Sequence, residues 1–151
     1  MNSPQQYVSH SVFGTSSAVC FNGTHKDNTR TINIDFADVQ QGRANWGRKI
    51  SLMVSDAEVP YVIGVLLGII PSFEGRFHGT GNNKSFALTM QNDGLYLQAS
   101  EPGRNFAIKA KPADVFHITS LVLGHLKPNF YGLNVDEIGR LVRCTVGRLA
   151  A

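Results

Sequence analysis

The sequence predicts an α+β fold of two four-stranded antiparallel β-sheets and two helices, in a ββββα-ββββα pseudo-repeat with a C-terminal helical tail. Three observations predict it. Short alternating apolar and polar runs are separated by turn residues, two segments have apolar residues at helical spacing, and the two halves of the chain resemble each other. The 151 residues fit one domain, 1–151, with halves at about 10–70 and 71–128 and a tail at 129–151.

The internal repeat becomes visible when Phe21 is laid on Phe77 and the chain follows without a gap, so that residues 47–68 lie on residues 103–124. Apolar and turn positions coincide as well as identities, which favours a repeat over the alternative of a chance likeness. The identical pairs are Phe21/Phe77, Gly23/Gly79, Thr24/Thr80, Gly47/Gly103, Arg48/Arg104, Ala57/Ala113, Val59/Val115 and Gly68/Gly124.

The first half contains four expected strands, the third of them weak. A helix follows them, and Ser55 and Glu58 have the spacing of a capping box at its start. Pro60 marks an alternative first turn, because proline suits the first position of a helix. The expected strands are residues 12–21, 30–36, 39–44 and 47–54.

The second half repeats this order with clearer turns. Asn92, Asp93 and Gly94 form a strong hairpin signal, and Pro112 marks the start of the helix. The expected strands are residues 76–80, 85–91, 94–100 and 104–110, and the helix has apolar residues at Val115, Ile118, Val122 and Leu126.

The first of these helices and the C-terminal segment raise the question of assembly. The helix at residues 59–70 is apolar almost all round, so it must be covered on every side. A partner subunit is the expected cover, and burial within one chain is the alternative. The C-terminal segment has Val135, Ile138, Leu141, Val142 and Val146 at helical spacing, with Arg140, Arg143 and Arg148 between them. It is either a helix that docks on a neighbour or a mobile tail whose arginines contact phosphates.

Composition is that of a soluble globular protein, with 42% hydrophobic and 17% charged residues and a net charge of +3. This charge permits a polyanionic partner without requiring one. The two cysteines, Cys20 and Cys144, lack metal-site spacing and favour a reducing, cytoplasmic location. The first ten residues show no leader or transit peptide, and the apolar run 59–70 is too short to cross a membrane.

No catalytic, metal or cofactor site is expected. Residues 79–85 faintly resemble a phosphate-binding loop, but Asn83 replaces the required glycine and the segment reads as a hairpin turn. The five histidines lack metal-ligand spacing, although His117 and His125 lie two turns apart on one expected helix. The carboxylates occur singly, so the sequence favours a protein that is not an enzyme.

Cations and aromatic residues recur along the expected strands, and that combination suits single-stranded nucleic acid. In the strand after Trp46, Ile50 and Leu52 share one face, and Lys49 and Ser51 share the other. The alternative is that the aromatic rings fill the core and the cations keep the sheets soluble. By the same alternation Arg48 and Arg104 face inward, where they would brace turns or subunit contacts.

The predicted nucleic-acid contacts divide by role. Bases are expected on Trp46, Phe86 and Tyr96, with Phe77 as the alternative to Phe86. The sugar–phosphate backbone is expected on Arg43, Arg48, Lys49, Arg76, Lys84, Arg104 and Lys109.

Several segments resemble the plant Whirly family. Residues 45–68 are similar to its Trp-Gly-Arg-Lys segment, which leads through an apolar strand into a helix. The likeness covers roughly residues 11–127, and the other similar segments are residues 10–21, 31–49, 85–92 and 105–126. Transcription coactivators and guide-RNA-binding proteins share this superfamily. The absence of a transit peptide suggests a bacterial, phage or plasmid relative.

The resemblance implies two blade-like antiparallel sheets, with helices that join subunits, commonly into a homotetramer. It also implies binding of single-stranded DNA with little sequence preference, along the sheets and between neighbouring subunits. One departure is that residues 13–19 replace the family's lysine-containing motif linked to assembly beyond a tetramer, so such assembly is not expected.

These observations predict a homo-oligomeric protein that binds single-stranded DNA through its sheets and serves replication, recombination, repair or transcription. Two alternatives stay open. RNA is the first, because stacking surfaces do not by themselves read the 2′-hydroxyl. A protein-interaction or transcription-cofactor module that binds no nucleic acid is the second.

Overall fold

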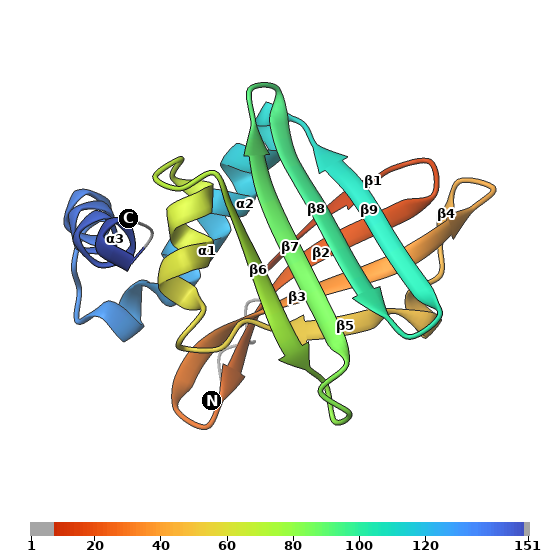
Figure 1. Cartoon of the computed structure of the whole chain (residues 1–151), viewed down its shortest axis with the longest axis horizontal. Coiled ribbons are helices and arrows are strands. Elements are labelled where there is room, and N and C mark those ends of the chain that lie inside the picture. Colours follow the sequence, from red (N-terminus) through yellow and green to blue (C-terminus); the bar gives the residue numbers. More distant parts are fainter. Residues whose placement is uncertain (1–7, 150–151) are drawn as a thin grey trace, which may run out of the picture.

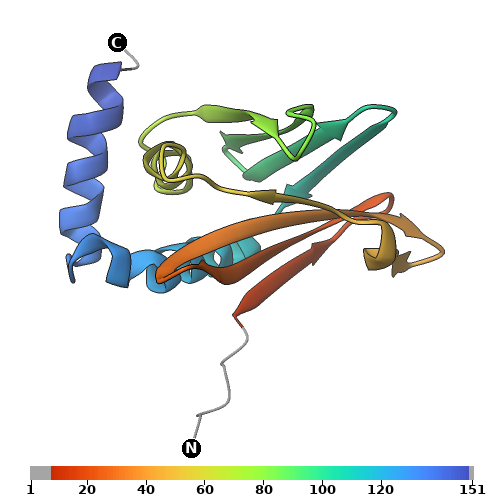
Figure 2. The same cartoon turned by 90° about the horizontal axis from the view of Figure 1, so that it is seen from below.

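The computed structural model describes residues 8–149, so the N-terminal segment examined for a leader lies largely outside the described residues. Two antiparallel sheets lie in layers, and the strands of one run across those of the other (Figures 1 and 2). The predicted α+β architecture of two antiparallel sheets is confirmed, but the first sheet has five strands instead of the expected four, and the second has four. No helix among the described residues is long and apolar enough to span a membrane.

The first sheet pairs its strands in the order β1-β2-β3, with β4 and β5 both paired to β3. Its strands are β1 (Ser9–Phe13), β2 (Ser17–Lys26), β3 (Thr29–Gln40), β4 (Arg43–Ala44) and β5 (Ile50–Met53). The expected first strand at residues 12–21 is therefore wrong as one strand, because Gly14 turns the chain there and its N–H bonds to the Ser17 carbonyl at 2.8 Å. The expected last strand begins only at Ile50, since Trp46–Arg48 forms a 3₁₀ turn, η1.

The second sheet is a meander in the order β6-β7-β8-β9, as the turn signals predict. Its strands are β6 (Ser72–His78), β7 (Lys84–Gln91), β8 (Gly94–Glu101) and β9 (Arg104–Ala110). The Asn92–Asp93 hairpin forms as predicted. Gly94 has a φ of 152°, and a Cβ there would collide with the Ala110 carbonyl, so this hairpin requires glycine.

The predicted helices form as α1 (Val59–Leu66), α2 (Pro112–Leu126) and α3 (Val135–Leu149), with a 3₁₀ turn, η2 (Lys127–Phe130), between the last two. The capping box does not start α1, because the N-cap is Glu58 and Pro60 lies in the first turn, as the alternative predicts. The Ser55 N–H donates to Glu58 Oε1 at 3.0 Å in the turn before the helix. The helix α2 packs against both sheets, and His125 Nε2 bonds to the Thr24 carbonyl of β2 at 2.9 Å.

The core lies between the two sheets and beneath α1 and α2. Alternation places one side of each strand in it, because successive side chains in a strand point to opposite faces. The largest fully buried side chains are Phe21, Phe36, Phe86, Ile32, Ile34, Ile50, Leu52, Ile63, Leu88, Leu95, Leu97 and Ile118.

The apolar helix α1 is covered within the chain. Its residues 62–66 are buried, and α3 packs against it on the side away from the sheets (Figure 2). The side chains of Ile138, Val142 and Val146 are buried in this contact. The alternative of burial within one chain therefore applies to α1, and a partner subunit is not needed to cover it.

Candidate nucleic-acid interface

One side of the molecule brings together the free edges of both sheets. β5 pairs only with β3, and β6 is the outermost strand of the second sheet, so each has an unpaired edge. Between these edges lies a groove of about 590 Å³, near the lower ends of β6 and β7 in Figure 1. It is lined by Ser51, Met53, Ser55, Glu58, Arg76, Phe77, His78 and Gly79.

Phe77 is the most exposed aromatic side chain of this groove, with 75% of its surface accessible. The register of β6 against β7 shifts between Gly75 and His78, and Phe77 has a φ of 65°. This bulge turns Phe77 outward and His78 inward, where His78 Nε2 lies 2.9 Å from Glu58 Oε2. A phenylalanine in the left-handed region costs about 1–3 kcal/mol, and such strain is concentrated at functional sites.

A second aromatic site, which we term the Trp46 corner, lies at the start of β5. The Trp46 and Phe13 rings meet edge to face, with centroids 6.4 Å apart, and 64% of Phe13 is exposed. Arg43 and Arg48 flank Trp46 in sequence, and both are exposed. Among the described side chains, those of residues 8–146, neither arginine forms an ion pair, so both guanidinium groups are available to an anion.

Lys49 begins the segment that connects the two aromatic sites. Its Nζ lies 3.2 Å from Asp35 Oδ2, and its side chain is 46% exposed. Asp35 is buried and also accepts hydrogen bonds from Asn22 Nδ2 at 2.8 Å and Ser51 Oγ at 2.5 Å. This network fixes Lys49 at the outer edge of the first sheet while leaving half of it in solvent.

The other predicted phosphate contacts are already paired with carboxylates. Arg76 Nε donates to Glu74 Oε1 at 2.9 Å, and this hydrogen bond lowers the pKa of Glu74 and raises that of Arg76. Lys84 lies 3.8 Å from Glu101. Lys109 lies 2.5 Å from Asp93 and lowers the pKa of that carboxyl. Because exposed ion pairs are weak, a phosphate can compete for Arg76 and Lys109, whereas the Lys84–Glu101 pair is less exposed.

Arg104 instead braces the fold, as the strand alternation suggested. Its guanidinium bonds to Glu101 at 3.1 Å and to Asp38 of the first sheet at 3.2 Å, and it lies 4.9 Å from the centre of the Phe106 ring. Only 22% of its side chain is exposed. These contacts tie the two sheets together and do not leave Arg104 free for a phosphate.

The expectation that Phe86 contacts a base is wrong for this structure. Only 1% of its surface is exposed, and its ring packs against Phe73 and His78. Tyr96 is partly exposed, but it lies opposite Lys109 on the outer face of the second sheet and outside the groove. Phe77, the alternative to Phe86, is exposed in the groove, and the exposed ring of Phe13 beside Trp46 is an aromatic group that the sequence analysis missed.

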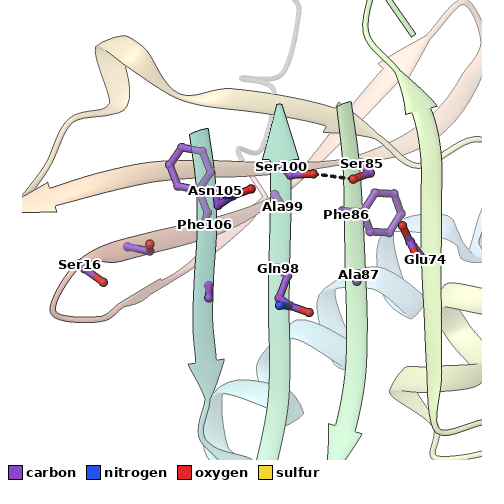
Figure 3. Close-up of a pocket in the computed structure, with 12 residues that line it drawn as sticks. Ser16, Glu74, Ser85, Phe86, Ala87, Gln98, Ala99, Ser100, Asn105 and Phe106 are labelled. Atoms are coloured by element: carbon purple, nitrogen blue, oxygen red, sulfur yellow. Dashed lines mark hydrogen bonds between the residues drawn. The ribbon is translucent and has the colours of Figure 1, made fainter. Parts of the chain in front are cut away.

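The outer face of the second sheet has a different chemistry. It carries a shallow groove of about 520 Å³ lined mainly by small and uncharged side chains, including Gln98 and Asn105 (Figure 3). Ser85 and Ser100 are bonded to each other across β7 and β8 at 2.8 Å. Glu74 is the charged residue of this lining. The lining of this groove therefore offers hydrogen bonds without positive charge, because Lys109 of the same face lies outside it.

Comparison with solved structures shows which known proteins have a similar fold. Similar solved structures include the plant transcriptional regulator PBF-2, at 13% identity over 85% of this chain and 86% of that chain, with a TM-score of 0.59. WHY3 and WHY1 from Arabidopsis thaliana each have 17% identity over 83% of this chain, covering 89% and 92% of theirs, with TM-scores of 0.57. The chain has a Whirly-like fold. No protein-family model and no curated protein matches the sequence.

The Whirly-like fold explains why the candidate interface cannot be read from one segment. It places the edge strand β5 of the first half beside the β6–β7 hairpin of the second half, so that Ser51 and Phe77 line one groove. In the part of the chain that the structure describes, no group of three or more histidine, cysteine or acidic side chains is placed to hold a metal ion.

Proposed function

We propose that the protein binds single-stranded DNA along the β5 edge, the surface from the Trp46 corner through Lys49 to the Phe77 groove. The observation that supports this most directly is the pair of exposed aromatic sites at the two ends of β5, each beside arginine. Unpaired bases stack on such rings, and each stacked base contributes about 1–3 kcal/mol.

The charges along the β5 edge suggest how a bound DNA strand is oriented. Glu58 and His78 lie at the inner side of the groove, with side chains only 13% and 12% exposed. A carboxylate there disfavours phosphate, so bases enter the groove and stack on Phe77. Arg43, Arg48, Lys49 and Arg76 then contact the sugar–phosphate backbone from outside, which gives little sequence preference because every nucleotide has a phosphate.

The comparisons support a role in handling nucleic acid rather than in catalysis, because PBF-2 is described as a transcriptional regulator. We propose, accordingly, a non-enzymatic cytoplasmic protein that acts in replication, recombination, repair or transcription. The homotetramer expected from the family resemblance stays part of this proposal. RNA is the second candidate ligand, since nothing in stacking on Phe77 or Trp46 discriminates against a 2′-hydroxyl.

The direct test is a titration of the protein with single-stranded DNA, double-stranded DNA and RNA of equal length at two salt concentrations. Single-stranded DNA should bind most tightly, and the logarithm of its affinity should fall with log salt by about 0.7 per phosphate contacted. Equal or tighter binding of RNA would favour the second candidate. No binding of any oligonucleotide at low salt would contradict the proposal and favour a protein-interaction module.

Breaking the Glu74–Arg76 ion pair is expected to strengthen DNA binding. Changing Glu74 to Gln should release Arg76 for phosphate and strengthen binding at low salt by roughly 1.5- to 5-fold, the range expected for one exposed ion pair. The matched control is Asp93→Asn, which releases Lys109 on the outer face of the second sheet and should leave the affinity unchanged. Fluorescence anisotropy with a labelled oligonucleotide measures both. An equal gain from the two variants would place phosphates on the sheet face instead.

A further inference from the structure

One side-chain pair fixes the end of β6 that carries Phe77. Glu58 is the N-cap residue of α1, which lies next to β6 in Figure 1, and His78 is the last residue of β6. Glu58 Oε2 lies 2.9 Å from His78 Nε2, and both side chains are largely buried. A carboxylate can only accept hydrogen bonds, so His78 Nε2 is the donor.

The surroundings of Glu58 let its carboxylate reach across to β6. The side chain does not cap α1, and its Oε1 instead accepts the Ser55 N–H at 3.0 Å in the turn before the helix. On the side toward β6 lies Gly75, where a Cβ would collide with Glu58 Oε2 and with the Phe86 ring. A glycine within a strand often marks a site of close approach, and here the approaching group is the Glu58 carboxylate.

The stability of the fold does not by itself account for the Glu58–His78 pair. Removing a carboxylate from water costs free energy, and apolar side chains of similar volume often stabilise a buried site equally well or better. The pair also maintains an unfavourable backbone, since Phe77 has a φ of 65°. In a regular β6, Phe77 would share the inward face of Phe73 and Gly75. Holding His78 inward therefore keeps Phe77 outward.

We propose that Glu58 and His78 are positioning residues for single-stranded DNA, because their bond holds the bulge that presents Phe77 to a base. This inference rests on the proposed function and adds that a residue at the start of α1 sets the affinity through the Phe77 ring. Without the bond, the ring is outward for only a fraction of the time, and the apparent affinity falls by that fraction. The effect of the pair should therefore vanish when the Phe77 ring is absent.

Two replacements of His78 test this role. His78→Leu removes the donor and should weaken binding of single-stranded DNA by roughly 5- to 30-fold, because a hydrogen bond to a charged group no longer favours the outward ring. His78→Gln places an amide donor near the position of Nε2 and should restore most of the affinity. The slope of log affinity against log salt should be unchanged in both, since no phosphate contact is lost. Anisotropy titrations measure the affinity, and thermal melts confirm that each variant is folded.

His10 provides the matched control. Its Nε2 lies 2.9 Å from Asp114 Oδ1, so it forms a bond of the same kind between β1 and α2, outside the Phe77 groove. His10→Leu should leave the affinity unchanged. The double variant with Phe77→Ala and His78→Leu should bind no more weakly than Phe77→Ala alone, because the pair then has no ring to position.

The bond can also be observed without nucleic acid. In NMR spectra of the free protein, the Hε2 proton of His78 should give a signal protected from exchange with water. Glu58→Leu removes the acceptor, so this signal should disappear and the affinity should fall as in His78→Leu.

Three results would overturn the inference: His78→Leu binds as tightly as His10→Leu, His78→Gln restores nothing, or the losses of His78→Leu and Phe77→Ala add. In each of these cases the unaltered protein still binds single-stranded DNA, so the proposed function stands. If the unaltered protein binds no single-stranded DNA at low salt, the proposed function and the inference both fail.

Discussion

Replacing Phe77 with alanine should weaken binding of single-stranded DNA by roughly 5- to 150-fold, which corresponds to the loss of about 1–3 kcal/mol from one stacked base. The ring is 75% exposed, so its removal from the free protein should change the free energy of unfolding by no more than about 0.5 kcal/mol. Anisotropy titrations at fixed salt measure the affinity, and thermal melts measure the stability.

Phe77→Gly is the sharper variant because it should lower the affinity for single-stranded DNA without lowering the stability of the protein. Glycine adopts a φ of 65° without this side-chain penalty, so this variant should be at least as stable as the unaltered protein. Its binding should nevertheless be as weak as that of Phe77→Ala. Such a result would show that the strained backbone is retained for the position of the ring.

Phe116 provides the matched control for Phe77. It is a phenylalanine of similar exposure, 69%, but it lies on α2 and outside the groove. Phe116→Ala should leave the affinity unchanged. If Phe77→Ala binds as tightly as Phe116→Ala, the Phe77 groove is not part of the interface and the bases must lie elsewhere.

The alternation of apolar residues identified the strands and their inward faces wherever a strand is regular. Phe86 and Leu88 are two residues apart in β7, so their side chains point to the same face, and both are buried. The apolar alternation was therefore already evidence against Phe86 as a base contact. The same rule fails at Phe77. The bulge after Gly75 reverses the faces of Phe77 and His78, and bulges have no reliable signature in a single sequence.

The internal repeat was informative for topology but not for register. Laying Phe21 on Phe77 correctly matches β5 with β9 and α1 with α2, yet it sets β2, the second strand of its sheet, against β6, the first strand of the other. The alignment of the two halves shifts because β2 and β3 are longer than the strands of the second sheet, and because β4 and η1 are inserted before β5. Trp46 lies in this inserted segment, so the repeat does not predict its position.

Which cations are free could not be predicted, because ion pairing depends on contacts between distant strands. Arg104 reaches Asp38, which is 66 residues away in sequence, and Lys49 reaches Asp35 across a strand pair. Arg43 and Arg48, in contrast, lie in β4 and η1 at the margin of the sheet, and neither forms an ion pair with a described residue. Sequence composition gives the number of cations, and only the fold determines which of them are left unpaired and able to bind a phosphate.

Replacing Phe86 with alanine should destabilise the protein by about 3–5 kcal/mol, the usual result of removing a large aromatic ring from a core. The ring fills the space beside Gly75, and it packs on Phe73 and His78 with centroids 6.2 and 5.4 Å away. For a chain of this length the loss corresponds to a fall in Tm of about 10 °C or more, measured by calorimetry.

Phe86→Leu is the control that keeps most of the buried volume, and it should cost clearly less than the alanine variant. At a temperature where Phe86→Ala remains folded, its affinity for single-stranded DNA should stay much closer to that of the unaltered protein than the affinity of Phe77→Ala does. The opposite pattern, a normal Tm with lost binding, would move Phe86 from the core to the interface. Variants of Phe77 and Phe86 therefore test the same geometry, in which the bulge in β6 exposes Phe77 and Phe86 stays in the core.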